Sequence, residues 1–155
     1  MLQTLQRRDR RERWVLKAPS HLSQLHTLFA VYPDARVVQI HRDPLRSVPS
    51  TISLMGTLRS MRCAEVDIDP LVPFVSLGYA AMLDAVMDDR DAGSLPDEQF
   101  VDVRYAELMT EPVTTLRAVY DQLGVVAPDD LGDRVTSHLA SRPKDVRGAH
   151  HYSLA

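Results

Sequence analysis

Cysteine and lysine are scarce in this sequence of 155 residues. The single cysteine, Cys63, excludes an internal disulfide framework and a zinc site made of four cysteines. Arginine carries almost all the positive charge, because Lys17 and Lys144 are the only lysines. The 18 basic residues are outnumbered by 21 acidic ones, and the net charge of −3 argues against a general nucleic-acid-binding protein.

Long apolar runs are absent as well. No stretch approaches 18 consecutive apolar residues, so the sequence predicts no membrane span. Residues 1–14 carry charge and are not followed by an uncharged apolar run, which is unlike a signal peptide. We therefore expect a cytoplasmic protein.

The composition is that of a globular domain, with 45% hydrophobic and 25% charged residues. A chain of this length fits one domain with a core of its own, so residues 1–155 are expected to form a single domain. Arginines crowd residues 1–12, which predicts a charged arm, and the polar residues 141–155 predict an irregular tail.

Three short apolar segments have the pattern of buried strands: 13–16, 35–40 and 100–103. Apolar residues at helical spacing predict a helix capped by Ser20 and further helices over 44–59, 71–87, 112–123 and 129–139. Asp43 suits an N-cap, Pro44 a first helical position and Gly124 a C-terminal stop. Residues 61–70 and 88–96 are expected to be loops.

This order of elements predicts an α/β fold, in which parallel strands are joined by right-handed crossovers and helices pack on the sheet. Ligands of such sheets collect beyond the carboxyl ends of the strands. Those ends lie at residues 17–21, 41–50 and 104–105.

The second of these places has the features of an anion site. Arg42 leaves the strand where a helix begins, and the free amides and dipole of a helix N-terminus favour an anion. An arginine can hold a phosphate through two hydrogen bonds, and Ser50, about two turns into the helix, can add a hydroxyl. The alternative, which the spacing alone favours, is that Arg42 pairs with Asp43 or another carboxylate and that Ser50 faces water.

Four segments together resemble the sulfotransferases, particularly the bacterial type: WVLKAPSHL, PDARVVQIHRDPLRSVPS, VDVRYAELMTEPVTTLRAVYDQLG and HHYSL. They occur in the order of the family and lie within residues 14–154. The resemblance implies a fold like that of P-loop nucleotide kinases. It also implies transfer of a sulfuryl group from 3'-phosphoadenosine 5'-phosphosulfate (PAPS) to an alcohol or amine, without a metal. The acceptor would be a small molecule or the hydroxyl of a glycan or lipid.

The resemblance also implies roles for individual residues. Arg42 and Ser50 have the spacing of the family's ligands for the 3'-phosphate of the donor, and Tyr105 matches a tyrosine beside the adenine. Tyr105 can equally cap the core through its hydroxyl. Arg147-Gly148 resembles a basic loop over the 3'-phosphate, and a solvated tail is the alternative.

Lys17 and His21 would form the catalytic edge implied by the resemblance. A lysine near the bridging oxygen would stabilise the leaving phosphate, and a histidine would accept the proton of the acceptor. The two residues stand further apart here than in the lysine-x-histidine pattern of the cytosolic enzymes. His21 can instead be a residue of the first turn of a helix, and Lys17 a solvated residue at the end of a strand.

A glycine-containing loop that would cradle the 5'-phosphosulfate is missing before residue 14, since the first glycine is Gly56. We therefore expect a shortened sulfotransferase-like domain with weak or no turnover by this chain alone.

Two other hypotheses stay open. One is a non-catalytic α/β module for association or nucleotide binding, in which a homodimer covers an open sheet edge. The other is an unrelated binding protein, which would be supported if strands 13–16 and 35–40 were not parallel neighbours.

Overall fold

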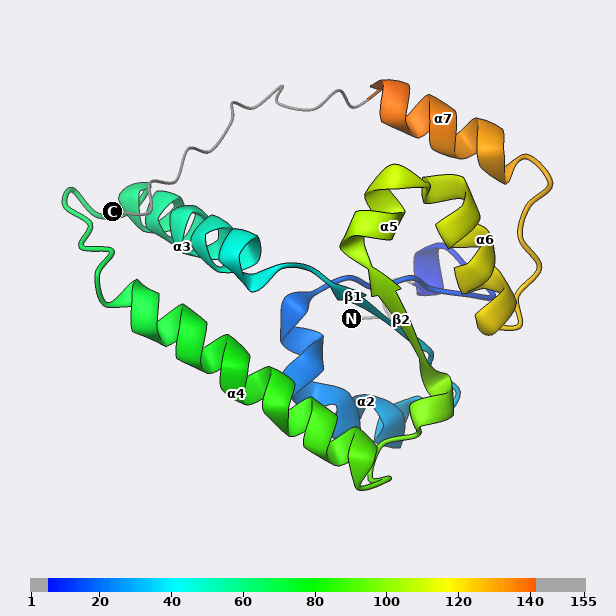
Figure 1. Cartoon of the computed structure of the whole chain (residues 1–155), viewed down its shortest axis with the longest axis horizontal. Coiled ribbons are helices and arrows are strands. Elements are labelled where there is room, and N and C mark those ends of the chain that lie inside the picture. The colour runs from blue at the N-terminus through cyan, green and yellow to red at the C-terminus, as the bar shows by residue number, and fades with distance from the viewer. Residues whose placement is uncertain (1–5, 142–155) are drawn as a thin grey trace.

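The computed structural model of the protein describes residues 6–141. A parallel pair of strands lies at the centre, with helices on both sides (Figure 1). Its elements follow in the order η1 (Pro19–Gln24), α2 (Leu25–Val31), β1 (Val37–His41), α3 (Pro44–Ser60), α4 (Leu71–Asp91), η2 (Asp97–Gln99), β2 (Phe100–Arg104), α5 (Tyr105–Thr110), α6 (Pro112–Gln122) and α7 (Leu131–Ser141). The predicted α/β class is confirmed.

The two strands pair in parallel from Val37 opposite Phe100 to His41 opposite Arg104. Residues 42–99, which include α3 and α4, form the crossover that a parallel pair requires. The predicted strands 35–40 and 100–103 are therefore confirmed, with shifts of one or two residues at their ends. This pairing puts the carboxyl ends of both strands at the same edge.

Residues of β2 alternate between two hydrophobic clusters, one on each face of the sheet. Phe100 packs with Leu25, Val86 and Leu95, which come from α2, α4 and the turn after α4. On the opposite face Val101 and Val103 pack with Val119 of α6. Because strand side chains point alternately to opposite faces, one short strand joins both parts of the core.

The predicted buried strand at residues 13–16 is wrong. The residues have no strand partner in the described part of the chain, and Val15 is 95% exposed. The Trp14 indole nitrogen is buried without a hydrogen-bond partner. An apolar pattern alone does not make a strand, because a strand also needs a neighbour for its backbone hydrogen bonds.

The helix expected after Ser20 is also different. Ser20 lies inside the 3-10 helix η1, whose N-cap is Ala18 and whose first residue is Pro19. The α-helix begins only at Leu25, and it ends at the predicted break, with Tyr32 as its C-cap. Pro19 explains the early start, because a proline is favoured at the first position of a helix.

Local signals set the start of α3 and the end of α6 as predicted. The Asp43 carboxylate accepts a hydrogen bond of 2.9 Å from the backbone amide of Leu45, and Pro44 is the first helical residue. Gly124 follows α6 with a φ of 64°, a left-handed conformation that glycine adopts without strain. The predicted helix over 129–139 is present as α7, two residues later at each end.

The structure differs from the prediction at the end of one helix and in one additional short helix. Helix α4 continues through Asp88, Asp89 and Arg90 to Asp91, where a loop was expected. The short helix α5, directly after β2, was not predicted. Tertiary contacts of Arg90, described below, account for the longer α4.

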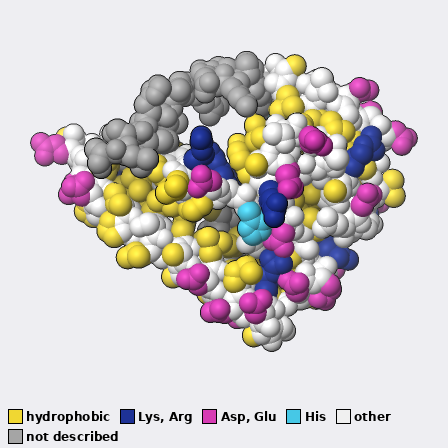
Figure 2. All heavy atoms as spheres, in the orientation of Figure 1, with side chains coloured by type: hydrophobic (Ala, Val, Ile, Leu, Met, Phe, Trp, Pro, Cys, Tyr) yellow, Lys and Arg dark blue, Asp and Glu magenta, His cyan; other side chains and the backbone are white. Residues whose placement is uncertain are grey.

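Helix α4 is long and apolar enough to cross a membrane by length and composition, and only 17% of its most apolar window is buried. One such helix is weak evidence for a membrane span, since core helices of other proteins pass the same test. Hydrophobic side chains gather along α3 and α4 on the face shown in Figure 2. The most exposed of them on α4 are Phe74 and Leu77.

Candidate functional site

Arg42 and Tyr105 meet at the carboxyl edge of the sheet. Each directly follows a residue of the last strand pair, His41 and Arg104. The Arg42 guanidinium carbon lies 4.8 Å from the centre of the Tyr105 ring, which is the geometry of a cation–π contact. Two residues more than sixty positions apart in sequence, both singled out above, are thus in contact.

The surroundings of Arg42 are those of a helix N-terminus. Asp43 uses its carboxylate to cap α3, and its carbonyl oxygen accepts hydrogen bonds from the amides of Arg46 and Ser47. Within the described residues no ion pair joins Arg42 to Asp43 or to another carboxylate, as the alternative reading of Arg42 had required. The guanidinium lies over the Tyr105 ring.

Ser50 lies in the second turn of α3 and is half-buried. No hydrogen bond joins its hydroxyl to Arg42 in the part of the chain that the structure describes. The neighbouring Thr51 hydroxyl contacts the carbonyl oxygen of Ser47 and the hydroxyl of Tyr79. Ser50 therefore lies on the same helix as the anion-favouring N-terminus, without a hydrogen bond to Arg42 in this part of the chain.

Lys17 and His21 lie on either side of the start of η1. Lys17 is exposed in an irregular segment, and His21 is half-buried in the first turns of the 3-10 helix, where its amide donates to the Ala18 carbonyl oxygen over 3.2 Å. Both alternatives given above, a solvated lysine and a histidine of a first helical turn, describe these positions. Arg147 and Gly148 lie outside the described residues.

A network that the sequence did not indicate lies beside this edge. Arg90 of α4, whose side chain is only 11% exposed, donates two hydrogen bonds to Asp102 of β2, of 2.7 and 3.1 Å. It also donates to Asp97 over 2.6 Å and to the side-chain oxygen of Gln39 over 3.4 Å. Its guanidinium carbon lies 4.5 Å from the centre of the Phe100 ring.

Asp102 has a second partner at the end of β1. The Nε2 atom of His41 lies 2.6 Å from Asp102 Oδ1, the oxygen that also accepts from Arg90. Hydrogen bonds from Arg90 lower the pKa of Asp102 to about 2, against the opposing effect of burial, and His41 adds a smaller lowering. Arg90 in turn has its pKa raised, chiefly by the Asp102 hydrogen bonds. Asp102 is therefore a carboxylate at neutral pH.

Acid should weaken the fold through Asp102. Its folded pKa lies below the ordinary value of 3.8, so its stabilising contribution is complete above that value and is lost as the pH falls towards 2. We expect the free energy of unfolding in urea to drop between about pH 5 and pH 2, as Asp102 is protonated first in the unfolded and then in the folded chain. The drop should be smaller in Asp102→Asn, and an equal drop in both proteins would contradict this origin.

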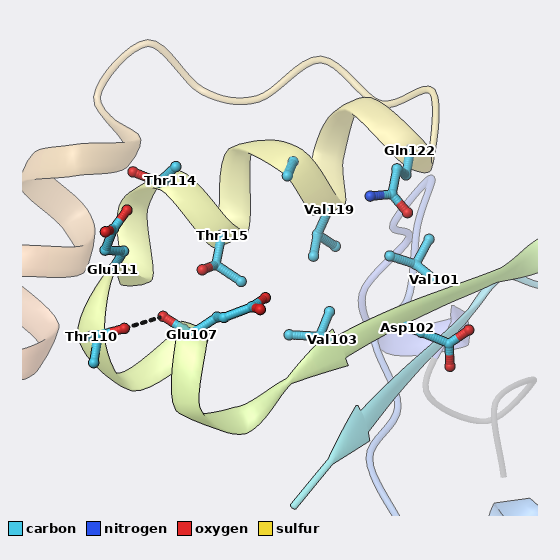
Figure 3. A pocket seen from close by; sticks show the side chains of 11 residues that line it. Val101, Asp102, Val103, Glu107, Thr110, Glu111, Thr114, Thr115, Val119 and Gln122 are labelled. Atoms are coloured by element: carbon cyan, nitrogen blue, oxygen red, sulfur yellow. Dashed lines mark hydrogen bonds between the residues drawn. The ribbon is translucent and has the colours of Figure 1, made fainter.

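A cavity of about 320 Å³ lies on the other face of the sheet, between β2, α5 and α6 (Figure 3). Val101, Val103 and Val119 point into it, while Glu107, Glu111, Gln122 and the threonines of α5 and α6 surround them. None of the residues singled out from the sequence lines this cavity. In residues 6–141 no group of three or more metal-ligating side chains is found.

Comparisons with known proteins agree on one family. A family model described as "Sulfotransferase family" matches residues 1–129. Omega-hydroxy-beta-dihydromenaquinone-9 sulfotransferase Stf3, from Mycobacterium bovis and from Mycobacterium tuberculosis, is 31% identical over 132 residues in both cases. These residues are 84% of this chain and 34% of the relative.

A solved structure is similar too. The crystal structure of sulfotransferase STF9 from Mycobacterium avium matches with a TM-score of 0.74 and 27% identity, over 85% of this chain and 34% of that chain. The chain thus spans about a third of the length of the relatives it matches. The missing strand at residues 13–16, named above as a sign of an unrelated fold, is outweighed by these matches.

Proposed function

The chain belongs to the sulfotransferase family, and we propose that Arg42 and Tyr105 form the part of its site that binds the adenosine 3'-phosphate of PAPS. The contact between these two side chains at the carboxyl edge of the sheet carries the proposal. The ring holds the guanidinium in place, and the N-terminus of α3 adds a partial positive charge beside it. A phosphate can then accept two hydrogen bonds from Arg42.

The proposed reaction is an in-line transfer of the sulfuryl group of PAPS to an acceptor hydroxyl or amine. The acceptor oxygen or nitrogen forms the new bond to sulfur as the bond from sulfur to the phosphate oxygen breaks, which releases adenosine 3',5'-bisphosphate. In this proposal Lys17 stabilises the negative charge on the leaving phosphate, and His21 accepts the proton of the acceptor. Ser50 and Arg147-Gly148 would complete the 3'-phosphate site.

The acceptor is proposed to be an apolar, lipid-like alcohol. The name of the relative Stf3 gives a hydroxylated menaquinone as its substrate, and the exposed apolar side chains of α3 and α4 would suit a substrate of that character. Arginine, lysine and backbone amides can bind the donor, so no metal is proposed for the site. The proposed location of the protein is the cytoplasm. Turnover by residues 1–155 alone is proposed to be weak, because no glycine precedes Gly56 to form a 5'-phosphosulfate cradle.

Calorimetric titration with adenosine 3',5'-bisphosphate tests the site directly. We expect the wild type to bind and Arg42→Ala to bind at least about tenfold more weakly, since a hydrogen-bonded charged contact contributes roughly 1.5–3 kcal/mol. Adenosine 5'-monophosphate, which lacks the 3'-phosphate, should bind both proteins with similar affinity.

Arg134→Ala is the matched control, because Arg134 is an exposed arginine of α7 that pairs only with Asp130 among its described neighbours. It should bind the bisphosphate like the wild type. The proposal fails if the wild type does not bind, or if Arg42→Ala binds as tightly as the wild type.

Association between copies is the second candidate function. Val38 and Ile40 of β1 are exposed although they lie in the sheet, on the face of Val101 and Val103. Parallel sheets are normally covered on both faces, so a homodimer would bury these side chains. A mass that rises with concentration in light scattering, without nucleotide binding, would favour this function over the first.

A further inference from the structure

His41 must donate its Nε2 hydrogen to Asp102. Asp102 is ionised and already accepts two hydrogen bonds from Arg90, so it has no hydrogen of its own to offer. The short contact of 2.6 Å therefore fixes the tautomer of a neutral His41, with hydrogen on Nε2, and fixes the orientation of its ring.

This contact ties down the last residue of β1. His41 is paired along the backbone with Arg104, whereas Asp102 is paired with Gln39, so the bond from His41 to Asp102 runs diagonally across the two strands. Diagonal neighbours in a sheet are within reach of long side chains. The next residue after His41 is Arg42, which lies beyond the last pair of the ladder.

Arg90 anchors the same network from the helix. It binds Gln39 of β1 and Asp102 of β2 at once, and its stack on the Phe100 ring fixes its guanidinium against the sheet. Asp102 therefore has a fixed position from which it holds His41. Asp97 also binds Arg90, but it contacts neither Asp102 nor His41 among the described residues.

We propose that Asp102, held by Arg90, is a positioning residue that acts through His41 to keep Arg42 against Tyr105 and thereby strengthens binding of a 3'-phosphorylated adenine nucleotide. This inference rests on the nucleotide site proposed above. Asp102 and His41 need not touch the nucleotide. Their effect is to limit the motion of the end of β1, so that less conformational entropy is lost when the phosphate orders Arg42.

Titration of four variants of the full chain with adenosine 3',5'-bisphosphate tests the inference. Asp102→Asn and His41→Leu should each bind roughly three- to tenfold more weakly than the wild type, as expected for loss of one hydrogen bond. His41→Gln should bind nearly as tightly as the wild type, because its amide nitrogen can replace Nε2 as a donor. Asp97→Asn removes one charged partner of Arg90 but leaves the hydrogen bond between Asp102 and His41. The affinity of this variant for the bisphosphate should therefore equal that of the wild type.

Adenosine 5'-monophosphate separates positioning from a general loss of structure. Binding of this ligand should be the same in all four variants, since the effect passes through Arg42 to the 3'-phosphate. The inference would be overturned if His41→Leu bound the bisphosphate as tightly as the wild type. It would also be overturned if Asp97→Asn and Asp102→Asn lost equal amounts of affinity for the bisphosphate. Failure of the wild type to bind either ligand would instead overturn the nucleotide site itself. If Asp102→Asn does not fold, the comparison of His41→Leu with His41→Gln tests the inference, because the His41 side chain is half-exposed and its replacement should leave the fold intact.

Discussion

Arg90→Ala is expected to lower the free energy of unfolding by about 2 kcal/mol, because it removes a largely buried side chain together with its charged hydrogen bonds to Asp102 and Asp97. The side chain is 11% exposed, and its removal leaves Asp102 and Asp97 without their shared counter-charge. It also removes the cation stacked on Phe100. Urea unfolding at neutral pH, followed by circular dichroism, measures the loss.

Arg90→Lys should lower the free energy of unfolding by less than Arg90→Ala, because lysine keeps the positive charge. It should still be less stable than the wild type, since lysine cannot make the two parallel hydrogen bonds to Asp102. Arg134→Ala removes an exposed arginine from its pair with Asp130 and should change stability by no more than about 0.5 kcal/mol. Comparable losses in Arg90→Ala and Arg134→Ala would show that the network adds little to stability.

Leu71→Ala is expected to lower the free energy of unfolding by about 3 kcal/mol. Leu71, the first residue of α4, is 1% exposed and is the largest fully buried side chain among the described residues. Truncation removes buried apolar surface and leaves a cavity where α4 begins. Thermal and urea unfolding both report this loss.

Leu83→Ala supplies the comparison for Leu71→Ala. Leu83 is in the same helix and is 42% exposed, so the same chemical change should cost about 1 kcal/mol or less. Similar losses at both positions would mean that α4 is not packed at its N-terminus as the structure has it.

Local chemistry made several elements predictable. Asp43-Pro44 has an acceptor side chain followed by a residue with a fixed φ, and the helix begins there. Gly124 allows the left-handed turn that ends α6. The β-branched segment before His41 formed the expected strand. Each of these signals acts within a few residues, so the sequence around it is sufficient.

Elements that depend on distant partners were predicted less well. The polar run Asp88–Asp91 was expected to be a loop, yet it is helical because Arg90 is held by side chains of β2 and η2. The apolar residues 13–16 have a strand pattern without a strand partner in the described chain. Neither outcome can be read from spacing, since it depends on what the folded chain places alongside.

The candidate site divides in the same way. The parallel topology predicted one shared edge for the residues that follow the strands, and Arg42 and Tyr105 do meet there. The bond between His41 and Asp102 joins residues 61 positions apart, and no local motif signals it. The roles of Lys17, His21 and Ser50 stay predictions.

The long crossover between β1 and β2 has a consequence for the folding pathway. Every hydrogen bond of the sheet requires the chain from residue 42 to residue 99 to close into a loop first, which costs configurational entropy before any strand contact is gained. Helices α3 and α4 can form from local hydrogen bonds alone and on a faster timescale. Strand pairing, and with it the contact between Arg42 and Tyr105, is therefore expected to be a late and rate-limiting step of folding. When α3 and α4 form first, they shorten the flexible chain that must close between the two strands.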